Sequence, residues 1–148
     1  MGLVTAGGMN PSQVREYVGH QHIQLRILFV EVRRALAEDR DPRPAILKLV
    51  YEVREHLDLE DRLLVPALRA IDRWGPQRAS EVAAEHARQR EELTALRERL
   101  RSSERSQAVE AAASLLAELT ADMDAEERDL LSPELLRDDL ITIGQNGG

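Results

Sequence analysis

The sequence predicts an all-α protein that folds as an antiparallel, up-down-up-down four-helix bundle. Four long segments repeat apolar residues with the 3.6-residue period of a helix, and short polar turns separate them. No stretch of useful length alternates apolar and polar residues as a strand would. A chain of 148 residues is about the size of one domain. We therefore expect a single domain over residues 1–148, with its core within residues 12–133 and flexible N- and C-terminal tails.

The first helix is expected to run from near Ser12 to near Glu38. Asn10 and Pro11 precede it, which is typical of a helix start, because asparagine caps free backbone N–H groups and proline fits the first turn. Residues 39–44 contain two prolines and cannot continue the helix. The apolar positions that follow the helical period are Val14, Val18, Leu25, Leu28, Val32 and Leu36.

The second helix is expected to begin near Pro44. Pro66 should bend or end this helix, because proline lacks a backbone N–H and clashes with the preceding turn. The Trp-Gly-Pro sequence at residues 74–76 is the latest point at which the helix can stop. Its apolar stripe consists of Ile46, Leu49, Val50, Val53, Leu57 and Leu64.

The third and fourth helices are expected over about residues 77–101 and 107–131. A serine-rich polar turn separates these two helices, and Pro133 ends the fourth helix. Residues 134–141 are predicted to form a short C-terminal helix. The inward positions are Val82, Leu93, Leu96 and Leu100 on the third helix, and Ala112, Leu115, Leu116, Leu119, Met123 and Leu130 on the fourth.

Composition excludes several kinds of function. The chain has no cysteine, which rules out disulfides, thiolate metal sites and a cysteine nucleophile. A formal net charge of −7 argues against a nucleic-acid partner, and no apolar run is long enough to cross a membrane. The N-terminal residues lack the basic and apolar parts of a signal peptide, so a cytoplasmic location is expected. Neither a serine–histidine–aspartate set nor a phosphate-binding glycine loop is evident.

Histidine and carboxylate residues interrupt the apolar stripes of all four predicted helices. Because an inward face should be apolar, residues of this kind within it are candidates for a binding site. His56 and Glu60 of the second helix are four residues apart, which places them one turn apart on the same face. The candidate metal ligands are His22, His56, Glu60, His86, Asp122, Glu126 and Glu127.

A bound metal ion accounts for these residues together. Burying a lone carboxylate is costly unless it is protonated, paired or bound to a cation, and bundle interiors commonly hold metal sites. Imidazole and carboxylate ligands without thiolate suit iron, manganese or zinc. Two metal ions bridged by carboxylates would be a natural arrangement of such a ligand set.

Ordinary structural roles also account for each residue taken alone. A single histidine beside an apolar stripe is commonly a hydrogen-bonded core residue, and a histidine–glutamate pair at this spacing is common on exposed helices. The charged residues 126–129 form a solvated run in this interpretation, and Arg90 pairs with Asp122 between the third and fourth helices. Because each of the four predicted helices contributes a candidate ligand, the metal interpretation is favoured over these ordinary structural roles.

Four motifs along the chain point to a known protein family. His22 precedes a leucine- and phenylalanine-bearing helical turn, and residues 56–66 read His-Leu-Asp-Leu-Glu-Asp-Arg-Leu-Leu-Val-Pro. A Glu-His step stands at residues 85–86, and residues 122–133 read Asp-Met-Asp-Ala-Glu-Glu-Arg-Asp-Leu-Leu-Ser-Pro. Over about residues 12–133 the chain resembles the hemerythrin-like HHE cation-binding domain family, and the second-helix motif is the most specific part of the resemblance.

The resemblance implies a ligand set. The residues that match iron ligands of the family are His22, His56 and His86, and Glu60 matches a carboxylate that bridges two irons. The second bridging carboxylate is Glu126 or Glu127, since the family places it four or five residues after a fourth-helix histidine. The resemblance therefore implies iron as the cofactor, as one ion or as a bridged pair, and zinc or manganese would use the same ligands.

Two positions depart from the family pattern. The fourth-helix histidine is missing; Asp122 fills its place if the paired glutamates set the register, and Met123 fills it if Pro133 does. We prefer Asp122. Arg90 stands where oxygen-carrying members have a further histidine, so the site is expected to be asymmetric and better suited to reduction than to reversible oxygen carriage. His20 lies on nearly the opposite side of the helix from the first-helix ligand, so it is expected outside the ligand set.

The resemblance implies a protein that binds, senses or reduces dioxygen, peroxide or nitric oxide, or that buffers iron. The expected partners are a small gaseous ligand or peroxide, with no nucleic acid and no membrane, and the chain is expected to be a monomer or a homodimer. In the alternative hypothesis, an Arg90–Asp122 ion pair replaces bound metal and the bundle is a metal-free helical interaction module that has lost part of the site.

Overall fold

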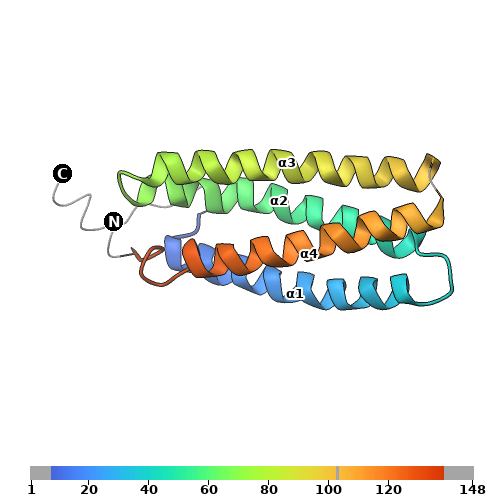
Figure 1. Cartoon of the computed structure of the whole chain (residues 1–148). Coiled ribbons are helices and arrows are strands. Elements are labelled where there is room, and N and C mark those ends of the chain that lie inside the picture. Colours follow the sequence, from blue (N-terminus) through green and yellow to red (C-terminus); the bar gives the residue numbers. More distant parts are fainter. Residues whose placement is uncertain (1–7, 103, 139–148) are drawn as a thin grey trace.

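Four long helices run alternately up and down and form the whole of the bundle (Figure 1). The computed structural model describes residues 8–102 and 104–138, and its helices are α1 (Pro11–Ala37), α2 (Arg43–Ile71), α3 (Gly75–Ser102) and α4 (Arg105–Asp129). The main contacts join α1 to α2, α2 to α3, α3 to α4 and α4 back to α1. The predicted antiparallel four-helix bundle is thereby confirmed. The tails that the sequence predicts to be flexible fall largely in residues 1–7 and 139–148, outside the described residues.

The predicted start of α1 is confirmed by a complete capping box. The Asn10 side chain accepts a hydrogen bond from the backbone N–H of Gln13 at 3.0 Å, and the Gln13 side chain accepts one from the backbone N–H of Asn10 at 3.0 Å. Two backbone donors that a helix start leaves free are satisfied in this way.

No described helix is both long and apolar enough to cross a membrane.

Pro66 lies inside α2, so the prediction that it might end the helix is wrong. An internal proline costs a helix about 3 kcal/mol, because it removes one hydrogen bond and crowds the preceding turn. Here the residues around it offset that cost by packing. Leu64, Ala67 and Leu68 are fully buried, and the helix reaches Ile71 before it stops.

The turn between α2 and α3 is tight, and α3 begins two residues earlier than predicted. The Asp72 side chain accepts a hydrogen bond from the backbone N–H of Trp74 at 2.9 Å and one from Arg78 at 2.8 Å. Gly75 then passes close to the end of α2. A Cβ atom at this position would lie 2.2 Å from the carbonyl oxygen of Leu68, so only glycine fits.

The segment after α4 folds back onto the start of α1. Residues 133–136 form a turn, so the C-terminal helix predicted to start at residue 134 is wrong over this stretch, and residues 139–141 lie outside the described part. Leu136 is fully buried, and its carbonyl accepts a hydrogen bond from Arg15 at 3.0 Å. The Asp138 carboxylate accepts hydrogen bonds from the backbone and side chain of Ser12. These contacts outweigh the local helix preference.

The bundle interior contains two apolar clusters, one at each end. Phe29 and Leu116 belong to the first cluster, and Val14 and Leu68 belong to the second. A polar layer lies between the clusters: on α1, for example, His22 stands between a valine of the second cluster and a leucine of the first. The buried polar residues of the described chain are His22, His56, Glu60, His86 and Gln89. The fold thus places a compact polar layer at mid-bundle.

Replacing Gly75 with alanine should destabilise the fold. The new Cβ atom would meet the Leu68 and Arg69 carbonyl oxygens at 2.2 and 2.5 Å, and backbone atoms cannot move aside easily. We expect a loss of about 1–3 kcal/mol in the free energy of unfolding, measured by urea denaturation of dilute protein. Gly19→Ala is the matched control, because an added Cβ meets nothing within 4 Å there. It should gain up to about 1 kcal/mol. Equal effects of the two substitutions would contradict this account of the turn.

Candidate metal centre

Four side chains from three helices converge in the polar layer. They are His22 of α1, His56 and Glu60 of α2, and Glu126 of α4, and one nitrogen or oxygen of each lies within 4.8 Å of the others. The first three are 0–5 % exposed, and the Glu126 side chain is 15 % exposed. Spacing of one helical turn puts His56 and Glu60 on the same face, as the sequence predicts.

The atoms of this cluster are close to one another without forming hydrogen bonds. His22 Nε2 lies 3.1 Å from Glu126 Oε1, His56 Nε2 lies 2.6 Å from Glu60 Oε1, and the two imidazole rings are 5.0 Å apart. Among the described residues, the buried side-chain atoms without a hydrogen-bond partner are His22 Nδ1 and Nε2, His56 Nδ1 and Nε2, Glu60 Oε2 and Glu126 Oε1. All of them belong to this cluster. Buried polar groups normally have partners, so this donor set fits a bound metal ion.

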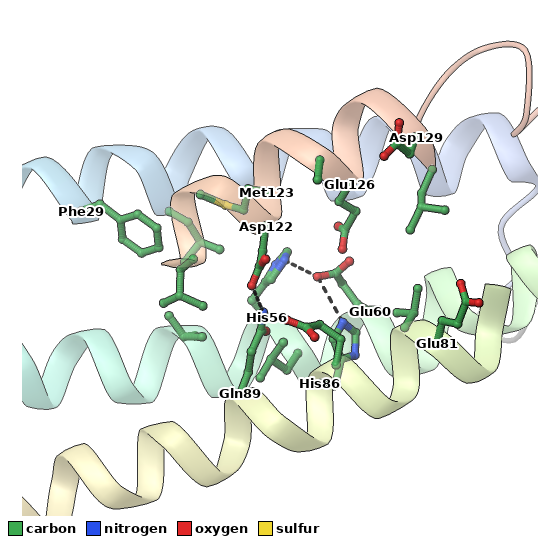
Figure 2. A pocket seen from close by; sticks show the side chains of 18 residues that line it. Phe29, His56, Glu60, Glu81, His86, Gln89, Asp122, Met123, Glu126 and Asp129 are labelled. Atoms are coloured by element: carbon green, nitrogen blue, oxygen red, sulfur yellow. Dashed lines mark hydrogen bonds and ion pairs between the residues drawn. The ribbon is translucent and has the colours of Figure 1, made fainter. Parts of the chain in front are cut away.

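His86 of α3 lies at the edge of the cluster and faces the same oxygen of Glu60 that His56 contacts. Its Nε2 lies 3.9 Å from Glu60 Oε1 (Figure 2). Its Nδ1 lies 2.6 Å from Asp61 Oδ1. Asp61 in turn accepts a hydrogen bond from Arg90 at 2.5 Å. With Asp61 as the acceptor, Nδ1 carries the proton and the Nε2 lone pair faces Glu60, which is the orientation of a metal-ligating histidine.

The structure brings Glu126, rather than Glu127, into the cluster. Glu127 turns outward, where it accepts a hydrogen bond from Arg26 at 2.8 Å, and its side chain is 34 % exposed. Its Oε1 remains 3.7 Å from His22 Nδ1. Arg26 also pairs with Asp124 at 2.7 Å. Glu127 therefore lies beside the imidazole of His22, which is a candidate ligand, and is not itself part of the cluster.

Asp122 is not brought into the cluster. Its carboxylate accepts a hydrogen bond from Gln89 at 2.7 Å, and its side chain is 36 % exposed (Figure 2). It lies instead in a separate group with Glu85 and Glu118, whose charge Arg88 partly neutralises. Met123, the other residue considered for the missing histidine position, is buried in the first apolar cluster.

The predicted Arg90–Asp122 ion pair is wrong. Arg90 points across to α2, where it contacts Asp58 at 2.9 Å and Asp61 at 2.5 Å. His20 is exposed, away from the polar layer. Gln89 was not identified from the sequence, although its position three residues after His86 places it on the same helix face. The Asp61–His86 contact joins two helices, and no pattern within one helix signals it.

Burial controls the ionisation of the cluster when no metal is bound. Burial raises the pKa of Glu60 to about 7 and that of Glu126 to about 8, and in Glu126 the neighbouring carboxylate adds to the effect. Burial lowers the pKa of His56 to about 4. The metal-free protein therefore favours the neutral forms of Glu126 and His56 at neutral pH. Glu127 behaves in the opposite way, since its hydrogen bond with Arg26 lowers its pKa.

A cavity of about 310 Å³ connects this cluster with the surface between α3 and α4. Figure 2 shows Glu60, His56 and His86 around its inner end, with Glu126 pointing toward them from α4. The remaining walls are partly apolar and partly acidic. They include Leu25, Phe29, Val53, Leu57, Leu119 and Met123 inside, and Glu81, Glu85, Asp122 and Asp129 toward the exposed side. A small molecule that enters this cavity can reach His56, Glu60 and Glu126 of the cluster.

The raised pKa values predict that the metal-free protein loses stability as pH rises from about 6.5 to about 8.5. A carboxyl group whose folded pKa lies above its ordinary value stabilises the fold while protonated, and this contribution is lost as pH passes through about 7 for Glu60 and about 8 for Glu126. His56, with its lowered pKa, contributes no change above its ordinary value of 6.5. Urea denaturation should show a loss on the order of 2 kcal/mol.

Glu126→Gln provides the control for this pH dependence. The amide has nearly the same shape and cannot ionise, so the loss of stability over the same pH range should shrink markedly. An unchanged slope in the variant, or constant stability in the native chain, would contradict the ionisation described for the cluster.

Comparison with known proteins agrees with the fold and with this cluster. The family model described as the hemerythrin HHE cation binding domain matches residues 14–135. No curated protein and no solved structure matches the chain significantly. The family match spans all four helices, and the candidate ligands from His22 to Glu126 lie within it. The chain belongs to the hemerythrin HHE cation-binding domain family, whose domain is a metal-binding helical bundle.

Proposed function

We propose that this HHE bundle is a non-haem iron protein that binds, senses or reduces dioxygen, peroxide or nitric oxide, or buffers iron. His22, His56, Glu60 and Glu126 would hold the metal. One observation carries the proposal: every unpartnered buried side-chain atom of the described residues belongs to these four side chains. Such atoms cost stability in a protein that has no ligand to fill the space between them.

The geometry favours one tightly held ion over a complete di-iron centre. His86 Nε2 lies 3.9 Å from Glu60 Oε1, outside the four-residue cluster, and it belongs to the only further imidazole near Glu60 among the described residues. Asp122, which would supply α4's ligand there, is hydrogen-bonded to Gln89 instead. Arg90, which stands where oxygen carriers have another histidine, is paired with two aspartates. A second ion at this position would have fewer protein ligands and should bind more weakly.

The ligand set suits iron and also suits zinc or manganese, so the choice of iron rests on the family resemblance. Bound iron would supply an open coordination position and the electrons that reduction of such small molecules requires. The protein's own residues fix the ligands, exclude bulk water and maintain a path from the surface. Because burial raises the pKa of Glu60 to about 7 and that of Glu126 to about 8, metal binding near neutral pH displaces protons from these carboxyl groups, and affinity should rise with pH.

The cavity supports a small, uncharged ligand. Its inner wall is lined by apolar side chains such as Phe29, Val53 and Leu119, which offer no hydrogen bonds to a larger polar substrate. Its outer part carries Glu81, Glu85 and Asp129, which attract cations and repel anions. Both features suit entry of a metal cation and then of dioxygen, nitric oxide or hydrogen peroxide.

Metal analysis tests the proposal. Protein purified with neither added metal nor chelator should contain about one iron per chain and absorb in the near ultraviolet. His56→Ala should lose the metal and the rise in melting temperature that added iron produces. His20→Ala, which removes an exposed imidazole from α1, should retain both. Absence of stoichiometric metal together with no stabilisation by iron, zinc or manganese would contradict the proposal and favour the metal-free interaction module.

Asp61 should act as a positioning residue for His86. Asp61→Asn weakens the hydrogen bond that fixes the imidazole, and loss of such a partner typically lowers metal affinity about 10–100-fold. The loss should fall on the second, weaker metal position beside His86 and leave the tightly held ion in place. Asp58→Asn is the matched control, because Asp58 pairs with the same Arg90 and does not contact the histidine in the described structure. Affinities are measured by competition with a chelating dye. Equal effects of the two variants would show that His86 takes no part in binding the metal.

A further inference from the structure

The solvent-facing side of α1 carries an exposed apolar stripe. Ile23, Ile27 and Val30 are 56 %, 57 % and 53 % exposed, and their spacing of four and three residues aligns them on one face. Among the described residues, no large hydrophobic side chain of α3 or α4 is exposed to a comparable degree. On α2, Leu47 and Tyr51 are also exposed, at 46 % and 62 %. A continuous stripe of three β-branched side chains in water is unfavourable, and it indicates a contact surface on α1.

Gly19 extends the same face by one turn. Glycine inside a helix costs about 1 kcal/mol relative to alanine. Within this bundle nothing requires it, because an added Cβ would meet no atom within 4 Å and the backbone angle is an ordinary helical one. A missing side chain on a solvent-facing helix surface does allow a long side chain of another molecule to lie against the backbone.

Opposite charges stand at the two ends of the stripe. Glu16 lies one turn before Gly19, and Arg34 lies one turn after Val30. Neither side chain forms an ion pair with another residue in the described part of the chain, whereas Arg26 on the same helix pairs with Asp124 and Glu127. The outer face of α1, defined here as Glu16, Gly19, Ile23, Ile27, Val30 and Arg34, is therefore acidic at one end, apolar in the middle and basic at the other.

We propose that the outer face of α1 pairs in antiparallel orientation with the same face of a second copy of this chain. If Ile23 of one copy lies against Val30 of the other, the two Ile27 side chains meet near the two-fold axis. Arg34 of each copy then lies beside Gly19 of the other and one turn from its Glu16. Arg34 of each copy thus lies near Glu16 of the other, so the same pair of opposite charges occurs twice, as the two-fold symmetry of an isologous interface requires.

Parallel pairing of the two helices is disfavoured by the same charges. It would place Glu16 beside Glu16 and Arg34 beside Arg34, and like charges in contact oppose association. The pairing leaves the metal cluster accessible, because His22 lies on the buried side of α1 and the cavity opens between α3 and α4. The dimer therefore does not depend on the metal proposal.

The molecular mass of the full chain in solution tests this pairing. Sedimentation equilibrium should give twice the monomer mass at micromolar concentration. Ile27→Glu should raise the dimer dissociation constant by more than about tenfold, because it places two carboxylates at the two-fold axis. Tyr51→Glu, on an exposed position of α2 outside this face, should leave the constant unchanged. A native chain that stays monomeric, including one whose own terminal residues cover the stripe, would overturn the proposal.

Charge reversal and cross-linking test the orientation. Glu16→Arg and Arg34→Glu should each weaken the dimer, and the double variant should restore it. Because the native chain has no cysteine, Ile27→Cys introduces a single thiol that should form an intermolecular disulfide on mild oxidation, whereas Tyr51→Cys should not. Failure of the double variant to recover, or equal cross-linking of the two cysteine variants, would overturn the antiparallel arrangement.

Discussion

The burial of two imidazoles and two carboxyl groups between two apolar clusters is the constraint on which the rest of this structure depends. Apolar residues pack above and below the layer, and the six buried side-chain atoms without a hydrogen-bond partner among the described residues all belong to it. The metal-free protein reduces the cost by keeping its carboxyl groups protonated and His56 neutral. A cation that replaces those protons would remove the cost and stabilise the fold.

The residues around the layer are asymmetric, and this asymmetry determines what the site can bind. On the α1–α4 side, Arg26 holds Glu127 outward, which leaves Glu126 free to face the cluster. On the α3 side, Asp61 orients His86, and Gln89 engages the carboxylate that would complete a second metal position. One half of the layer thus resembles a finished ligand set and the other a partial one. The surrounding hydrogen bonds, rather than the inward residues alone, produce the difference.

The sequence predicted the fold almost completely, because each helix carries its own periodicity and end signals. Its errors lie where contacts between helices decide the outcome. Of the two effects expected of Pro66, to bend or to end α2, the second is wrong, because packing on both sides carries the helix past it. Glu126 and Glu127 differ by one step of about 100° around the helix, so the pattern left both open, and contact with Arg26 separates them. The partner of Arg90 likewise depends on the distance between α2 and α3, which no periodicity within one helix encodes.

Anomalous X-ray diffraction from crystals of the protein, purified without added metal or chelator, tests the central claim most directly. Data collected on either side of the iron absorption edge locate the metal and identify it at once. We expect one strong anomalous peak within coordination distance of His22, His56, Glu60 and Glu126, with at most a weaker one beside His86. No peak in this cluster, or a peak only among Glu85, Glu118 and Asp122, would contradict it.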